Sequence, residues 1–313
     1  MGSMRRSLLL CAVFLLGAAC TSGSGDAGSP SPAQTNFALE VASSDLYVGA
    51  PQRVDVGVFG STDQGVELLT GGAIPVSLVS PSGGDPISGT ATYVPAPGTQ
   101  VAKQPSLTPP SQARGVYQLS DVTFPTSGQW QAQLSFSAGG QPISLTDTFD
   151  VAEKPALPAP GEPAIASKNL TMASTGVSPE AIDSRAQDGA KVPDQELHQQ
   201  TIADALRAGR AALVLFATPV YCTSQFCGPT TDELEQIART GPKDADYIHI
   251  EIWNKHTQQQ QTLNKAAADW LYRNKNLTEP WLYLIGPDGT IVDRWSPLFD
   301  VGEVKAELQR VAG

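Results

Sequence analysis

The chain has 313 residues, of which 41% are hydrophobic and 16% charged, and its four cysteines are too few for a disulfide-stapled miniprotein. The 20 basic and 31 acidic side chains leave a net charge of −11, which does not favour binding to nucleic acid or to an anionic membrane surface. The length predicts two domains, and the 29 Gly and 25 Pro predict many turns and at least one linker.

Residues 1–19 have the pattern of a secretory signal. Two arginines precede an uncharged apolar run that is shorter than the about 20 residues needed to span a bilayer. The run ends in Leu-Gly-Ala-Ala-Cys, which resembles the lipobox of bacterial lipoproteins, with Gly17 where the lipobox usually has Leu. This resemblance implies cleavage before Cys20 and lipid attachment to Cys20, whereas ordinary secretion would leave Cys20 free or remove it. Residues 20–35 then predict a flexible tether on the extracytoplasmic side of a bacterial membrane.

Composition divides the rest of the chain into two modules. Residues 21–152 carry 3 basic and 10 acidic side chains, whereas residues 153–313 carry 15 and 21. Four prolines within nine positions lie just after this change in composition, and they predict a stiff, extended spacer. We therefore expect a first domain over 36–152, a Pro-rich linker over 153–194 and a second domain over 195–313.

The first module has the pattern of an all-β domain. Apolar residues alternate with polar ones, which predicts antiparallel strands with one buried face, as in a β-sandwich. The segment 126–136 resembles a late strand of immunoglobulin-like bacterial domains. The module contains no histidine or thiol, so we expect it to serve in spacing or docking. The alternating sets are Phe37/Leu39/Val41, Val54/Val56/Val58, Ile74/Val76/Leu78 and Trp130/Ala132/Leu134/Phe136.

The second module alternates helical and strand patterns. A continuous apolar run over 211–217 predicts a central strand buried on both faces. The expected order is helix, strand, helix, strand, helix, two strands and helix, which makes an α/β domain. The predicted ranges are 201–208, 211–217, 229–239, 247–252, 262–275, 281–285, 290–295 and 301–311.

Two cysteines directly after the first buried strand, with Glu279-Pro280 opening the hairpin, resemble the thioredoxin fold. The similarity covers about residues 195–313 and is greatest to the extracytoplasmic, membrane-tethered proteins of the TlpA/ResA kind. It implies a thiol–disulfide oxidoreductase that needs no metal or cofactor and acts on extracytoplasmic protein thiols and disulfides. The resemblance makes Cys222 and Cys227 the redox pair, and Pro280 the cis-proline that faces it. The acidic group that the family buries in the preceding strand is missing, since residues 213–216 are Leu-Val-Leu-Phe.

The spacing of the pair differs from the family's Cys-x-x-Cys. On an ideal α-helix, Cα atoms five residues apart are separated by about 8.7 Å, which exceeds the about 7 Å that a disulfide allows. Either Cys222 therefore lies in the loop before the helix, which Gly228-Pro229 favours, or the first turn unwinds on oxidation. Cys227 at the helix N-terminus would have a stabilised thiolate, whereas Cys222 follows the strand at the family's distance. We favour Cys222 as the nucleophile and Cys227 as the resolving thiol.

Tyr221 and Trp281 adjoin the predicted site and are candidates for a substrate groove, with core packing as the alternative for Trp281. Oligomeric state is not predicted by any of these patterns.

Three other functions fit parts of the sequence. The cysteines could form a permanent structural disulfide in a binding module without catalysis. A peroxiredoxin-like peroxidase would use Arg294 beside the thiolate, although Pro219 replaces the threonine of that family. A copper-delivery protein of the Sco type needs a histidine in the hairpin region, where the sequence has none. We expect His198 and His256 to be solvated, and His249 to lie at the surface or to be lightly buried.

Overall fold

The computed structural model describes residues 36–63, 65–99, 101–112, 114–138 and 141–312. The signal, the lipidated Cys20 and the tether were predicted for residues that lie outside this part of the chain. Thr35–Gly313 form one compact unit. Among the described residues, every helix is too short or too polar to cross a bilayer.

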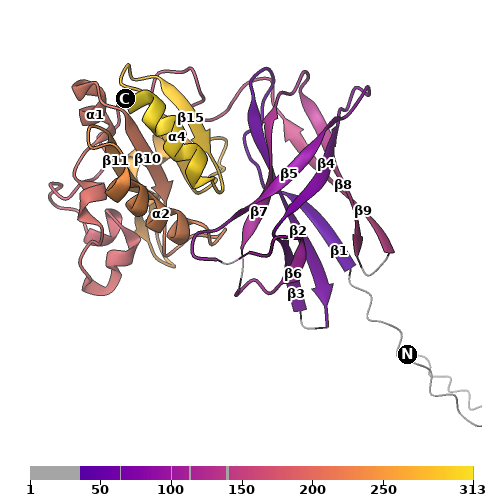
Figure 1. Ribbon diagram of the computed structural model, residues 1–313. Helices are drawn as coiled ribbons and strands as arrows, with labels where there is room; N and C mark the ends of the chain where they lie inside the picture. Colours follow the sequence, from indigo (N-terminus) through magenta and orange to yellow (C-terminus); the bar gives the residue numbers. More distant parts are fainter. Residues whose placement is uncertain (1–35, 64, 100, 113, 139–140, 313) are drawn as a thin grey trace, which may run out of the picture. The chain divides into compact units, whose positions relative to one another are not determined.

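The N-terminal region is all-β and antiparallel, as predicted. Its strands form one hydrogen-bonded sheet in the order β6-β3-β2-β7-β5-β4-β8-β9, and β1 pairs with β2 (Figure 1). The predicted alternation is confirmed at Val54, Val56 and Val58, whose side chains are at most 1% exposed. The strands are β1 (Asn36–Val41), β2 (Gln52–Thr62), β3 (Gly65–Thr70), β4 (Ala73–Val79), β5 (Ile87–Pro95), β6 (Ser106–Thr108), β7 (Gly115–Val122), β8 (Gly128–Ala138) and β9 (Gln141–Val151).

The C-terminal region is mixed α/β and contains a four-stranded sheet in the order β11-β10-β14-β15. The central strand β10 (Ala212–Ala217) runs parallel to β11 (Asp246–Glu251) and antiparallel to β14 (Trp281–Ile285). All six residues of β10 are buried, as its continuous apolar run predicts. The other elements are η1 (Pro179–Ala181), η2 (Ser184–Gly189), η3 (Gln195–His198), α1 (Ile202–Ala208), α2 (Cys227–Thr240), β12 (Trp253–His256), β13 (Gln261–Leu263), α3 (Lys265–Leu271), β15 (Ile291–Trp295) and α4 (Val301–Ala312).

The helices cover the two faces of this sheet in pairs. Val214 and Phe216 pack on one face with residues of α1 and α3, including Ile202 and Trp270. Leu213, Leu215 and Ala217 pack on the other face with residues of α2 and α4 (Figure 1). Because successive side chains of a strand point to opposite faces, the strand β10 contributes to both cores. The cysteine pair therefore follows a rigid, fully buried strand.

The segment that precedes α1 is attached to the α/β region. Gly161 N–H donates to Ile291 O, and Ile291 N–H donates to Glu162 O, each within 2.9 Å. Farther along, Asn169 Oδ1 accepts from Ile202 N–H at the start of α1. These bonds hold the segment against the edge strand β15 and the first helix.

Ion pairs connect the β region with the α/β region. Arg53 of β2 binds Asp293 of β15 and Glu303 of α4, and its guanidinium lies 5.0 Å from the Trp295 ring centroid. Asp45 and Arg294 make a second, buried pair at 2.7 Å.

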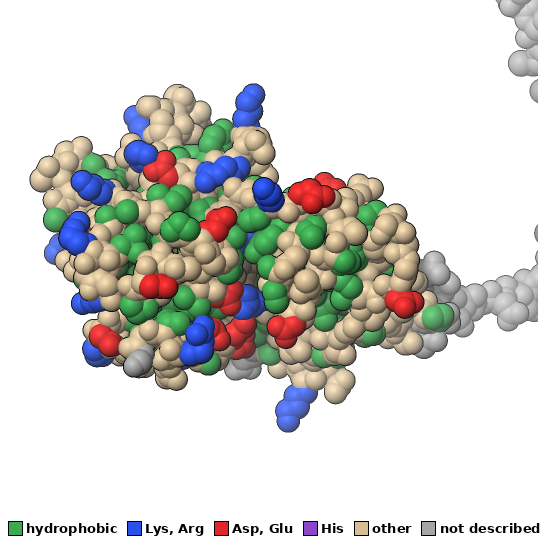
Figure 2. Space-filling view, turned by 90° about the horizontal axis from the view of Figure 1, so that it is seen from above, with side chains coloured by type: hydrophobic (Ala, Val, Ile, Leu, Met, Phe, Trp, Pro, Cys, Tyr) green, Lys and Arg blue, Asp and Glu red, His purple; other side chains and the backbone are tan. Residues whose placement is uncertain are grey.

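On the face drawn in Figure 2, basic and acidic side chains are interspersed. Its basic side chains therefore do not form one continuous patch.

Candidate functional site

The candidate site is built around the Cys222–Cys227 disulfide. Cys222 lies in the loop after β10, Cys227 is the first residue of α2, and their Cα atoms are 5.9 Å apart. The pair is thus close enough to bond, and Cys222 lies before the helix, as the spacing argument favoured. Gln225, between them, has a φ of 64°. This left-handed turn reverses the chain so that four intervening residues fit into a short loop.

The surroundings of the two sulfur atoms are unequal. Cys227 is fully buried in the core that β10 shares with α2 and α4, whereas Cys222 is only half-buried. Cys227 N–H, at the start of α2, donates to Cys222 Sγ at 3.2 Å. The Ser224 hydroxyl lies 3.2 Å from the same sulfur. Because helix N-terminal N–H groups stabilise a thiolate, this geometry favours negative charge on Cys222.

Glu279 is an acidic residue beside the disulfide that was not predicted from the sequence. One of its carboxylate oxygens lies within 4.8 Å of both sulfur atoms. Thr223 N–H donates to Oε1 at 3.4 Å, while the buried Oε2 has no hydrogen-bond partner among the described residues. Burial raises the pKa of Glu279 to about 7, although the Thr223 N–H partly opposes the shift. The carboxyl can therefore change protonation near neutral pH.

Glu279 was noted in the sequence only as the residue before Pro280. The resemblance to thioredoxin-like proteins directed attention to the strand before the cysteines, and that strand is apolar here. The signal that could have found Glu279 was its position beside the proline expected to face the redox pair. The Glu279–Pro280 peptide bond is cis, and Pro280 is buried immediately before β14.

The two aromatic candidates lie beside the site in different roles. The Tyr221 ring stacks on His256 with centroids 4.1 Å apart, and its hydroxyl donates to Gln187 Oε1 at 3.3 Å. Trp281 is 3% exposed, so its ring packs in the core and does not line an open groove. Its indole N–H donates to Thr278 Oγ1 at 2.9 Å.

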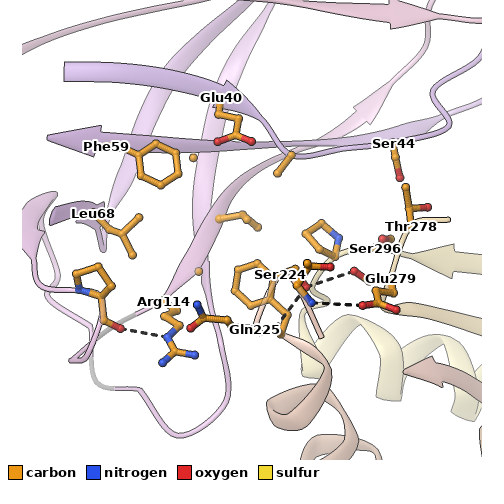
Figure 3. A pocket seen from close by; sticks show the side chains of 18 of the residues that line it. Glu40, Ser44, Phe59, Leu68, Arg114, Ser224, Gln225, Thr278, Glu279 and Ser296 are labelled. Atoms are coloured by element: carbon orange, nitrogen blue, oxygen red, sulfur yellow. Dashed lines mark hydrogen bonds between the residues drawn. The ribbon is translucent and has the colours of Figure 1, made fainter. Parts of the chain in front are cut away.

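A cavity of about 580 Å³ opens beside the disulfide loop. Its walls include Phe59 and Leu68 from the β region and Phe226 and Glu279 from the α/β region. Figure 3 shows Ser224 and Glu279 together at one end, with Glu40, Phe59 and Leu68 on the opposite side. Phe226 also packs with the apolar cluster of Val94, Ala96, Val116 and Leu298. The β region thus forms one wall of the space that the loop faces.

Arg294, the candidate cation for a peroxidatic thiolate, is engaged elsewhere. Its guanidinium binds the Asp45 carboxylate at 2.7 Å and the Pro158 carbonyl at 3.0 Å. Both side chains of this ion pair are 7% exposed. The charge of Arg294 is therefore neutralised by Asp45.

Two of the histidine predictions are wrong. His198 was expected to be solvated and His249 to be at most lightly buried, but they are 0% and 1% exposed. The error arises because the polar segment carrying η2 and η3 folds over β11, so His198 and His249 approach Asp183. His256 is half-buried under the Tyr221 ring.

The chain matches no protein-family model, and it has no significant match among curated proteins or solved structures.

Proposed function

We propose that this protein is a thiol–disulfide oxidoreductase that exchanges disulfides with extracytoplasmic proteins through Cys222 and Cys227. The observation that carries the proposal is the asymmetric pair: a half-buried Cys222 sulfur that accepts the Cys227 N–H, with the Glu279 carboxyl within 4.8 Å. A structural disulfide requires neither an N–H directed at one sulfur nor an acid that titrates near pH 7. Reactive cysteines typically lie in such partly exposed, electropositive surroundings.

The exchange begins at the accessible sulfur. A partner thiolate attacks Cys222 Sγ and forms a new S–S bond, while the Cys222–Cys227 bond breaks and its electron pair remains on Cys227 Sγ. The neutral Glu279 carboxyl transfers its proton to Cys227 Sγ, which leaves a mixed disulfide, a thiol and a carboxylate. A second partner thiolate then attacks the partner sulfur of the mixed disulfide and releases Cys222 as a thiolate. The partner is thereby oxidised and the protein reduced.

The same groups serve the opposite direction. In a mixed disulfide of Cys222, the Glu279 carboxylate accepts the proton of the Cys227 thiol, and the resulting thiolate attacks Cys222. This attack re-forms the intramolecular bond and releases the partner sulfur as a thiolate. A group with a pKa of about 7 is present in both protonation states at neutral pH, which suits a general acid–base catalyst.

The remaining parts of the molecule support this proposal. We propose a thioredoxin-like fold for the α/β region and an immunoglobulin-like fold for the β region, which forms one wall of the cavity at the redox loop. That cavity is the proposed docking place for the partner segment that carries the reacting sulfur. The signal pattern, Cys20 and the tether support lipid attachment outside the cytoplasm, where an oxidising environment maintains disulfides.

The test combines a redox titration with trapping. The Cys227→Ser variant should form a stable mixed disulfide when its Cys222 thiolate attacks a disulfide-containing peptide and releases the peptide's other sulfur as a thiol, since the resolving thiol is gone. The Cys222→Ser variant is the matched control and should trap none, because Cys227 is fully buried. A reduction potential below about −300 mV, together with no trapping by Cys227→Ser, would establish the structural disulfide instead.

A further inference from the structure

A second cluster of chemically capable side chains lies away from the cysteines, where Asp183, His198 and His249 meet. Asp183 precedes η2, His198 ends η3 and His249 lies in the middle of β11. Asp183 Oδ2 is 3.4 Å from His198 Nε2 and 3.3 Å from His249 Nδ1. All three side chains are at most 1% exposed. Three segments distant in sequence thus bring their donor atoms to one buried point.

Hydrogen bonding within the protein accounts for only part of this arrangement, because the two rings approach Asp183 Oδ2 at 3.3 and 3.4 Å without well-aligned hydrogen bonds. His249 Nε2 lies 3.3 Å from Ala217 O, and a carbonyl oxygen only accepts, so we assign the ring proton to Nε2. In the neutral His249 ring, Nδ1 then carries a lone pair and lies 3.3 Å from Asp183 Oδ2. Neither Nδ1 of His249 nor either ring nitrogen of His198 has a hydrogen-bond partner among the described residues. Since buried polar groups are nearly always partnered, the ring nitrogens that face Asp183 leave room for an electron-pair acceptor among them.

The spacing of the donor atoms fits a metal ion. Two ligands bound tetrahedrally at about 2.05 Å are separated by about 3.35 Å, and the two measured separations are 3.3 and 3.4 Å. Two imidazoles and one carboxylate are ligands that zinc favours. Contacts to the atoms that do not face the cluster hold two of these side chains in place. His249 Nε2 contacts Ala217 O, and Asp183 Oδ1 accepts from Arg185 N–H at 2.9 Å and from Arg185 Nε–H at 3.0 Å. Metal ligands are commonly held in this way.

The charges near the cluster tolerate a divalent cation. The Arg185 guanidinium also binds Asp183 Oδ2 at 2.7 Å, but it is shared with Asp194 at 2.8 Å and Asp232 at 3.6 Å. Its positive charge is thus matched by carboxylates other than Asp183.

We propose that Asp183 Oδ2, His198 Nε2 and His249 Nδ1 bind a zinc-class divalent metal ion, with a fourth position left for water. The site would tie η2 and η3 to β11, because all three ligands are buried and far apart in sequence. Its function is therefore structural, and it is separate from the proposed exchange at Cys222. Metal would enter during folding, since the ligands are closed off from solvent in the folded chain.

The test uses the full chain with the Cys222–Cys227 disulfide intact and the thiols of Cys11 and Cys20 alkylated, so that no thiolate competes for metal. The protein is unfolded with a chelator, refolded with Zn²⁺ alone, desalted and analysed for bound zinc. We expect about one zinc per chain and a higher melting temperature than after refolding with chelator. Asp183→Asn and His249→Gln should each lower the bound zinc at least tenfold, whereas His256→Gln, the matched control outside the cluster, should retain it.

Refolding with Co²⁺ alone keeps the proposal testable if those variants fail to fold. The wild-type chain should show the visible absorption of tetrahedral cobalt with nitrogen and oxygen ligands, without a thiolate charge-transfer band. No stoichiometric zinc or cobalt in the oxidised wild-type protein, or cobalt bound with a thiolate band, would overturn the proposal.

Discussion

Glu279→Gln isolates the negative charge that lies next to the Cys222–Cys227 pair. The substitution keeps the size of the side chain and its Oε1 acceptor for Thr223 N–H, but removes the titration near pH 7. Measurement in a Cys227→Ser background leaves Cys222 as the thiol of the site. We expect Glu279→Gln to lower the pKa of that thiol.

The size of the effect follows from Coulomb's law. Two like charges 4.8 Å apart, the outer limit of the carboxylate–sulfur separation, repel by about 3.5 kcal/mol at an effective dielectric constant of about 20. One pKa unit corresponds to about 1.4 kcal/mol, so full repulsion equals about 2.5 units. Because Cys222 and Glu279 are both partly accessible to water, we expect a decrease of about 1 to 2 units.

The assay is the rate of alkylation by iodoacetamide as a function of pH. Glu40→Gln is the matched control, since Glu40 lines the opposite side of the same cavity and loses the same charge (Figure 3). It should shift the thiol pKa by less than about 0.3 units because exposed charges are screened. A shift below about 0.5 units for Glu279→Gln, or an equal shift for Glu40→Gln, would refute the role assigned to Glu279.

The oxidised wild-type protein provides a second measurement. Its rate of reduction, expressed per attacking thiolate, should fall by up to about tenfold between pH 6 and pH 8, as Glu279, with a pKa of about 7, loses the proton that it gives to Cys227. The Glu279→Gln variant should show no such step. An unchanged step in the variant would assign the proton transfer to another group.

Two further predictions concern stability. Burial raises the pKa of Asp55 from 3.8 to about 7. The folded state therefore binds more protons than the unfolded state between about pH 4 and pH 7. As the pH rises through that window, the free energy of unfolding should fall by up to about 4 kcal/mol. Asp55→Asn should reduce this slope in urea unfolding and leave the part that the raised pKa of Glu279 contributes, and an unchanged slope would contradict the assignment. Arg53→Ala leaves Asp293 and Glu303 unpaired beside each other and should lower the free energy of unfolding by about 2 to 3 kcal/mol. Lys265→Ala, which breaks an exposed pair with Asp269, should lower the free energy of unfolding by at most about 0.5 kcal/mol. Equal losses for the two variants would show that the ion pairs of Arg53 stabilise the fold no more than an exposed pair does.

The elements with clear periodicity could be predicted from the sequence. The alternation at Ile74, Val76 and Leu78 and the apolar run of β10 both matched buried strands, because side-chain direction in a strand follows from local geometry. The predicted helix over 262–275 is shorter, Lys265–Leu271. Asn274 and Lys275 have positive φ values, which a helical repeat in polar residues does not reveal. The β12–β13 hairpin was missed because its residues are polar and do not alternate.

The sequence by itself determined that Cys222 and Cys227 are near one another, since four intervening residues limit their separation and helix geometry excludes an intact helix across both. Only the tertiary structure decided what surrounds them. Glu279 reaches the sulfur atoms from the loop before β14, and Asp183 meets His198 and His249 only because η2 and η3 fold over β11. Such meetings depend on which segments pack together across long sequence separations. No local pattern of polar and apolar residues encodes them.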